Sequence, residues 1–186
     1  MPPAPGSIIL LNGASSAGKS TLCQALQDRL PGPFLQFSLD FLMFGSPVLP
    51  TRREGSGPFS WVAMRPRLFE GYFACLAALA GAGNNLVIDY IIEEQAQLSR
   101  LVSLLGPFDV FLVGVHCPLP ELERRERERG DRRPGDARRD FGTVHTFTPY
   151  DLEVDSTRPA QENAEGIISA WKERRRPGIL GRLNTP

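Results

Sequence analysis

Short apolar runs alternate along this chain of 186 residues with longer segments whose apolar residues recur every three or four positions. The short runs predict strands, because a strand buried on both faces of a parallel sheet is almost continuously apolar. They cover residues 7–12, 34–40, 86–89, 108–115 and 151–155. The longer segments predict amphipathic helices at 18–30, 68–79, 96–105, 118–129 and 159–173. This alternation predicts an α/β fold, a three-layer sandwich around a parallel sheet.

Glycine and proline mark the breaks between these elements. Two segments contain no regular pattern: residues 41–61, which mix Gly and Pro with aromatic residues, and residues 130–140, which are rich in Gly and Arg. Residues after Arg174 are expected to form a loose tail. The length fits one domain spanning residues 1–186, and no repeat interrupts it.

Charge and composition narrow the function classes. The chain has 21 Lys and Arg against 21 Asp and Glu, so it lacks the basic field with which proteins attract nucleic acid. No apolar run is long enough to span a membrane and the N-terminus lacks a leader pattern, so we expect a cytoplasmic protein. Cys23, Cys75 and Cys117 lie in apolar contexts and are expected to be reduced, buried thiols.

One motif carries specific chemistry. Residues 13–20 read GASSAGKS and match the pattern G-x-x-x-x-G-K-[ST] between a predicted strand and a predicted helix, which is the context this phosphate-binding loop requires. The backbone N–H groups of such a loop cradle phosphate oxygens, its Lys reaches the β- and γ-phosphates of ATP, and its Ser holds Mg²⁺. The residues expected to bind nucleotide are Gly13, Ala14, Ser15, Ser16, Ala17, Gly18, Lys19, Ser20 and Thr21.

Two carboxylates end predicted strands at the edge of the sheet where ligands bind. Asp40 could accept the proton of an attacking hydroxyl as a catalytic base, or could simply cap the next helix. Asp89 could support Mg²⁺ together with Ser20, or serve in capping or acceptor binding. The adjacent Tyr90 is either a packing residue or an acceptor contact.

The segment of about residues 41–62 is the candidate acceptor-binding loop. Its apolar side chains suit an aromatic or lipophilic alcohol, although a satellite hydrophobic cluster would look the same. These side chains are Phe41, Met43, Phe44, Phe59 and Trp61.

Arginines recur among glutamates in the segment of about residues 124–140. Most of these charges are expected to form a solvated, salt-bridged helix face. Phosphoryl transfer also needs cations around the transferred group, and an arginine lid commonly supplies them. Arg129 and Arg132 are the candidates, because they flank the glycine at which the helix gives way to a loop.

The absence of an Asn-Lys-x-Asp signature argues against a GTPase, which leaves a small kinase as the favoured class. The chain resembles the chloramphenicol phosphotransferase family over nearly its whole length. The matching residues are 8–20, Phe37-Ser38-Leu39-Asp40, residues 113–117, Arg129-Gly130-Asp131-Arg132 and residues 150–155.

This resemblance implies an ATP-dependent kinase that phosphorylates the primary hydroxyl of chloramphenicol, with Asp40 as base, Lys19 and Ser20 as nucleotide and Mg²⁺ contacts, and Arg129 and Arg132 in a lid. The chain departs from the family between Phe41 and Met64 and at Tyr90, where the family tends to have a second Asp. Two alternatives stay open: a metabolic or nucleoside-type kinase, and a module that binds nucleotide without transferring phosphate.

Overall fold

A computed structural model describes residues 4–45, 48–129 and 135–184. Within these ranges, five parallel strands form one sheet in the order β2–β3–β1–β4–β5. The strands are β1 (Ser7–Asn12), β2 (Phe34–Gln36), β3 (Asn85–Tyr90), β4 (Asp109–His116) and β5 (Leu152–Asp155). The predicted α/β sandwich with a parallel sheet is confirmed.

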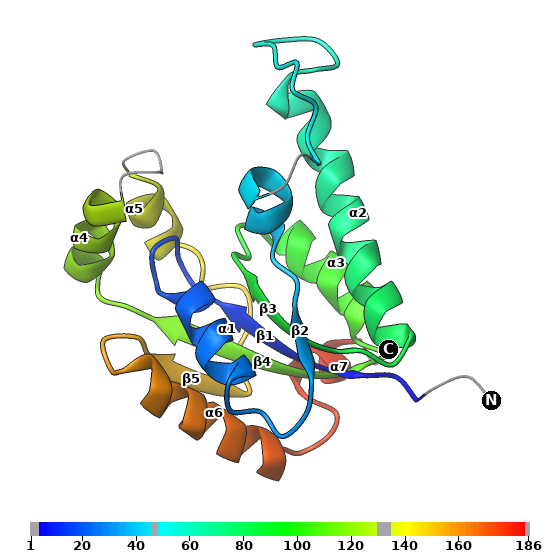
Figure 1. Cartoon of the computed structure of the whole chain (residues 1–186), viewed down its shortest axis with the longest axis vertical. Coiled ribbons are helices and arrows are strands. Elements are labelled where there is room, and N and C mark those ends of the chain that lie inside the picture. The colour runs from blue at the N-terminus through cyan, green and yellow to red at the C-terminus, as the bar shows by residue number, and fades with distance from the viewer. Residues whose placement is uncertain (1–3, 46–47, 130–134, 185–186) are drawn as a thin grey trace.

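Helices cover both faces of this sheet (Figure 1). One face carries α1 (Lys19–Gln27) and α6 (Ala160–Glu173), and the other carries α2 (Trp61–Gly81), α3 (Gln95–Leu105) and α7 (Ile179–Leu183). Beyond the strand ends lie α4 (Leu119–Arg129), α5 (Asp136–Phe141) and the π-helical turn η1 (Phe41–Gly45). No helix in the described ranges is both long and apolar enough to cross a membrane.

The two cores follow from the alternation of side chains along each strand. In β1, Ile9 and Leu11 pack with α1 and α6, whereas Ile8 and Leu10 pack with α2, α3 and α7. All four side chains are fully buried. The central strand is therefore covered on both faces, and this fixes the position of the loop that follows it.

The second strand is shorter than predicted. β2 ends at Gln36, and Leu39 and Asp40 already lie in a helical turn that leads into η1. The carbonyl of Phe37 accepts a hydrogen bond from the hydroxyl of Tyr72 at 2.9 Å. Because the Tyr72 hydroxyl satisfies this carbonyl, the carbonyl needs no partner in a neighbouring strand, and the chain leaves the sheet before Asp40.

The expectation that residues 41–61 are irregular throughout is wrong at both ends. Phe41–Gly45 is the helical turn η1, and α2 begins at Trp61 rather than at Leu68. The start of α2 is fixed by Ser60, whose Oγ accepts the backbone N–H of Ala63 at 3.3 Å. An N-cap of this kind satisfies a backbone donor that the first turn would otherwise leave unpaired.

Two further expectations are corrected. Part of the segment 130–140 is helical, as α5. The chain after Arg174 is no loose tail, because α7 docks on the sheet and buries Leu180 completely. Asp151 holds it there: its carboxylate accepts the backbone N–H of Ile179 and that of Leu112 in β4, both at 2.9 Å.

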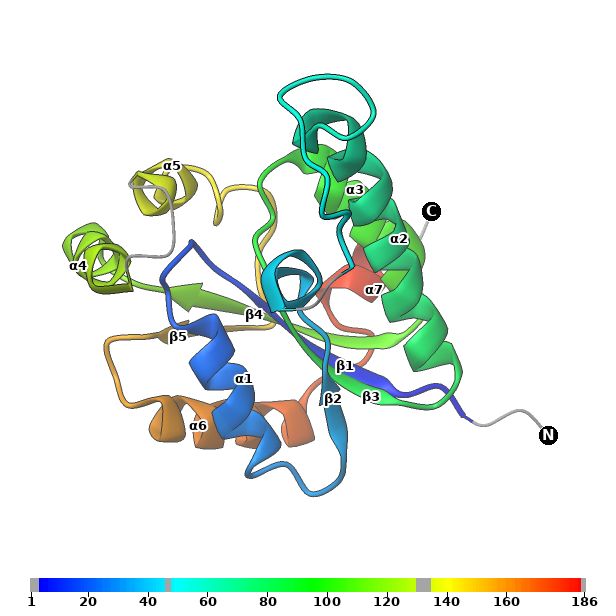
Figure 2. The same cartoon turned by 45° about the horizontal axis from the view of Figure 1, so that its top comes forward.

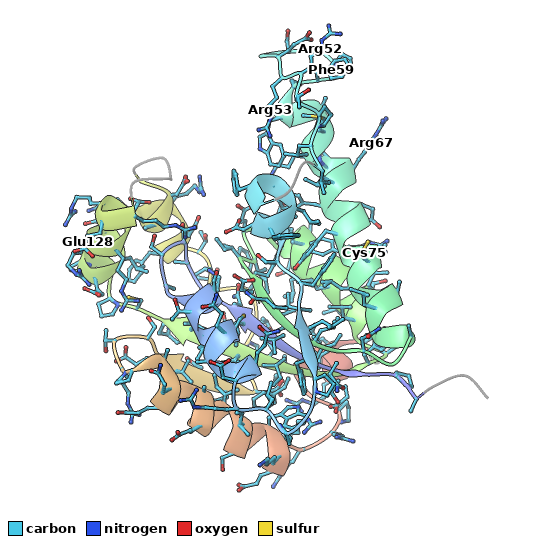
Figure 3. All side chains as sticks on the ribbon, viewed as in Figure 1. Arg52, Arg53, Phe59, Arg67, Cys75 and Glu128 are labelled. Atoms are coloured by element: carbon cyan, nitrogen blue, oxygen red, sulfur yellow. The ribbon has the colours of Figure 1, made fainter. Side chains whose placement is uncertain are left out.

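The three cysteines are free, as expected, but they are not all buried. Cys23 and Cys117 belong to the core beneath α1 and α6. Cys75 lies on the outer side of α2 and is exposed (Figure 3). The buried residues Phe73 and Leu76, next to it in sequence, lie on another face of the same helix.

Candidate active site

The loop of residues 13–18 connects the central strand β1 to α1. β1 is flanked by β3 on one side and β4 on the other. The strands β2 and β3 lie to one side of β1 and β4 and β5 to the other, so the direction in which strands are added changes at β1. Ligands of open α/β sheets bind at such points. Figure 2 shows the loop between α4 and α5 on one side and η1 and α2 on the other.

The backbone of this loop requires its small residues. Gly18 has φ +84°, and Ser16, with φ +63°, also lies in the left-handed region that side chains rarely adopt. A Cβ on Gly13 would lie 2.6 Å from the carbonyl oxygen of Val115, so a larger residue there would displace β4 or the loop.

Lys19 is folded back over the loop. Its side chain is buried, and its Nζ donates to the carbonyls of Gly13 and Ala14, both at 2.8 Å. Burial lowers the pKa of Lys19, while the negative charges of Asp89, Asp40 and Asp140 oppose that shift. The lysine thus lies among three carboxylates at the floor of the site.

Ser20 and Asp89 form a pair suited to a divalent cation. The Oγ of Ser20 donates to Oδ2 of Asp89 at 2.6 Å, and Oδ1 of Asp89 is buried without a hydrogen-bond partner among the described residues. Mg²⁺ favours a few oxygen ligands combined with phosphates and water over a closed protein cage. This donor set fits Mg²⁺, and the described part of the chain contains no cluster of three or more His, Cys, Asp or Glu that could hold a metal.

A cavity of about 440 Å³ opens above the loop. Its floor is made by residues 15–21 and Asp89, and Asp40 borders it from the turn before η1. The wall on the side of η1, α2 and β3 includes Leu39, Met43, Phe69, Tyr90, Ile91 and Glu93. The opposite wall, from α4 and α5, consists of Arg125, Arg129, Asp136, Arg139 and Asp140.

The structure brings most of the predicted site residues to this cavity. Residues 15–21, Asp40, Asp89 and Arg129 border it, and Gly13 and Ala14 lie directly beneath, in contact with Lys19. Arg132 lies outside the described residues.

Only one of the five aromatic and Met side chains proposed for the acceptor loop borders the cavity, namely Met43. Phe41 and Phe44 are exposed, and Phe59 lies under the guanidinium of Arg52 at the projecting end of α2 (Figure 3). The loop of residues 48–60 therefore points away from the cavity, and Phe69 of α2 supplies the aromatic wall in its place.

Eight residues that border the cavity were not among the predicted site residues: Leu39, Phe69, Ile91, Glu93, Arg125, Asp136, Arg139 and Asp140. The two arginines lie in the Arg-rich segment, so their region was found although they were not singled out. Neither Glu93 nor Asp140 belongs to a recognisable motif: Glu93 lies in the segment between β3 and α3, and Asp140 is brought to the loop by α5.

A second hollow, of about 420 Å³, adjoins the loop at Gly18 and Thr21. Its other side is made by residues 156–160 and Asn163. Arg125 borders both hollows, and its guanidinium is held by the carboxylate of Glu121 at 2.7 Å and the carbonyl of Ser156 at 2.9 Å. The site thus extends from the phosphate loop in two directions.

A protein family described as chloramphenicol phosphotransferase-like matches residues 6–172. The chain belongs to this family. Two curated proteins of Mycobacterium tuberculosis strains, each named "Putative O-phosphotransferase", are 30% identical to the chain over 198 residues, which cover 96% of this chain and 88% of theirs.

Solved structures share the fold of this family member. The APS kinase of Mycobacterium tuberculosis, solved with AMPPNP and APS, superposes with a TM-score of 0.65 at 19% identity, over 91% of this chain and 99% of that one. The tunicamycin resistance protein of Deinococcus radiodurans gives 0.62 at 21%, over 88% and 94%. These likenesses confirm the kinase-like fold predicted from the phosphate loop.

Proposed function

We propose that this chain is an ATP-dependent O-phosphotransferase that moves the γ-phosphate to a hydroxyl of a small molecule. The observation that carries the proposal is that Asp40 and the phosphate loop border one cavity. A carboxylate facing the phosphate end of a nucleotide can take the proton of an attacking alcohol. Membership of the family supports the same reaction class.

In this proposal the loop holds the phosphates of ATP, and the hollow beside Arg125 holds its base. The loop offers backbone N–H groups and the N-terminus of α1, and Lys19 supplies the positive charge. The guanidinium of Arg125 is fixed in the lining of the second hollow, where a planar base can stack on it. The structural relative APS kinase was solved with the ATP analogue AMPPNP.

The transfer follows from these placements. Asp40 accepts the hydroxyl proton while the alcohol oxygen attacks the γ-phosphorus in line and the bond to the ADP oxygen breaks. Ser20 and Asp89 would hold Mg²⁺, which would supply positive charge to the nucleotide phosphates. Lys19 and Arg129 stabilise the negative charge of the transferred group.

The acceptor we propose is an alcohol with an apolar or aromatic body, such as chloramphenicol or a related antibiotic. The cavity wall opposite α4 and α5 presents Leu39, Met43 and Phe69. Glu93, on the same wall, is paired with Arg65, so the charges there are largely balanced and an uncharged acceptor is favoured. Phosphorylation of an antibiotic hydroxyl would give resistance.

The test is an acceptor screen with ATP and Mg²⁺, read by mass spectrometry of the product and by ADP release. Asp40→Asn is expected to lower turnover at least about 100-fold with nucleotide affinity nearly unchanged, since only the base is lost. Lys19→Ala is expected to weaken both. Turnover that survives Asp40→Asn would overturn the base assignment.

The same assay separates the alternatives. A metabolic or nucleoside-type kinase would act on a sugar, an acid or a nucleoside in the panel rather than on antibiotic alcohols. A nucleotide-binding module would bind ATP without any acceptor raising ADP release above the background hydrolysis of ATP.

A further inference from the structure

A carboxylate from α5 reaches into the phosphate loop. Oδ2 of Asp140 accepts the backbone N–H of Ser15 at 3.0 Å, across 125 positions of sequence. Both residues are buried, and only 2% of the Asp140 side chain is exposed. A buried carboxylate next to a phosphate-binding loop is unexpected, because it places a negative charge near the negative charges of the nucleotide.

The same peptide group is held from its other end. The Ala14–Ser15 peptide presents its carbonyl to Nζ of Lys19 at 2.8 Å and its N–H to Asp140 at 3.0 Å. A cation on the oxygen and an anion on the N–H fix the orientation of one peptide plane. The next residue, Ser16, has the unfavourable φ of +63°, so the loop backbone is strained immediately after this peptide.

The second oxygen of Asp140 holds a cavity arginine. Oδ1 accepts from Nη2 of Arg139 at 2.9 Å and from Nε at 3.2 Å, and Asp136 holds Nη1 of the same guanidinium at 2.8 Å. Two carboxylates thus orient Arg139, and only Asp140 also contacts the loop among the bonds of the described residues.

Packing alone does not explain this carboxylate. Burial raises the pKa of Asp140, although the bonds from Ser15 and Arg139 oppose the shift. The ionised form is therefore unfavourable for folding, and a neutral or apolar residue at this position would stabilise the core more. Such a cost is common where a charge serves a site.

We propose that Asp140 is a positioning residue that fixes the Ala14–Ser15 peptide of the phosphate loop and holds Arg139 at the edge of the cavity. This role deepens the phosphotransferase function proposed above and rests on it. In this role Asp140 acts through the loop and through Arg139, the two groups that its carboxylate oxygens bind.

The direct readout is the exchange rate of the Ser15 amide proton, measured by NMR on the free protein without nucleotide. Asp140→Leu keeps the branched shape but accepts no hydrogen bond, and exchange is expected to quicken at least about tenfold. Asp140→Asn keeps an accepting oxygen, and exchange should stay within about threefold of the wild type. Asp136→Asn is the matched control, because it loosens Arg139 without touching the loop, and it should leave this exchange rate unchanged.

ATP affinity, measured by calorimetry, gives the functional consequence. Asp140→Leu is expected to weaken ATP binding roughly 10- to 100-fold, as for the loss of one charge-assisted hydrogen bond, and Asp140→Asn to restore most of it. The proposal is overturned if Asp140→Leu leaves exchange and affinity unchanged, or if Asp136→Asn quickens exchange as much.

Should Asp140→Leu not fold, Asp140→Ala takes its place with the same expected rise in exchange, and an unchanged exchange rate in Asp140→Ala overturns the role. Because the exchange measurement needs neither ATP nor acceptor, it stands even if no acceptor is ever phosphorylated. Absence of transfer in the wild type would instead overturn the proposed function.

Discussion

The hydroxyl of Ser20, at the first turn of α1, donates to Oδ2 of Asp89, at the end of β3, across 2.6 Å. Two segments far apart in sequence thus join at the floor of the phosphate site. The second oxygen of Asp89 is buried and has no hydrogen-bond partner in the described part of the chain. A polar atom in this state is costly to the fold unless a ligand uses it.

This pair predicts a specific dependence on Mg²⁺. Asp89→Asn removes the charge that attracts the cation, and we expect the Mg²⁺ concentration for half-maximal ADP formation to rise about tenfold or more. The measurement is a Mg²⁺ titration at saturating ATP. Ser20→Ala should shift the titration in the same direction, and an unchanged titration in both variants would exclude the pair from the metal site.

Two buried tyrosines are expected to differ in their contribution to stability. The hydroxyl of Tyr72 donates to the carbonyl of Phe37, whereas that of Tyr90 has no hydrogen-bond partner within the described residues. Tyr72→Phe should therefore lower the free energy of unfolding by about 1 kcal/mol, and Tyr90→Phe should leave it equal or higher. Urea denaturation compares the two, and a loss above about 1 kcal/mol in Tyr90→Phe would show that its hydroxyl is satisfied.

The C-terminal helix α7 is expected to stabilise the fold through its packing on the sheet. Leu180 is fully buried, whereas Leu183 in the same helix is half exposed. Leu180→Ala should lower the free energy of unfolding by about 2–5 kcal/mol, and the control Leu183→Ala by less than about 0.5 kcal/mol. Equal small effects in thermal or urea unfolding would mean that this helix does not pack on the sheet in solution.

Stability is expected to fall in mild acid because of His145. Burial lowers its pKa to about 4, and His116, stacked on it at a ring distance of 3.9 Å, and Lys19 add to the shift. The unfolded chain binds a proton at this residue below about pH 6.5, while the folded chain resists it until about pH 4. The free energy of unfolding should therefore drop between about pH 7 and 4 by roughly 1–2 kcal/mol, allowing for solvent screening.

His145→Gln should remove this part of the pH dependence, measured as urea unfolding at several pH values. His116→Gln serves as a comparison, since removing the stacked ring should reduce the slope without abolishing it. If His145→Gln keeps the wild-type slope, other groups are responsible for the acid sensitivity.

The sequence alone determined the fold class and the phosphate loop. Buried parallel strands and amphipathic helices have local periodicities, and the loop needs glycine and lysine at fixed spacings, so residues 13–20 and the strand before them could be recognised without coordinates. The position of Asp89 at a strand end also made it a candidate for metal support, capping or acceptor binding, because the ends of parallel strands meet at one edge, and the structure places it beside Ser20.

The tertiary structure decided what lies opposite that loop. Asp140 meets Ser15 only because α5 folds over the site, and the aromatic wall comes from Phe69 of α2 instead of the expected loop. Likewise, Leu180 is buried because Asp151 holds the start of α7. Such contacts depend on the docking of distant elements, which leaves no local period or spacing in the sequence, whereas strands, helices and the phosphate loop are set by neighbouring residues.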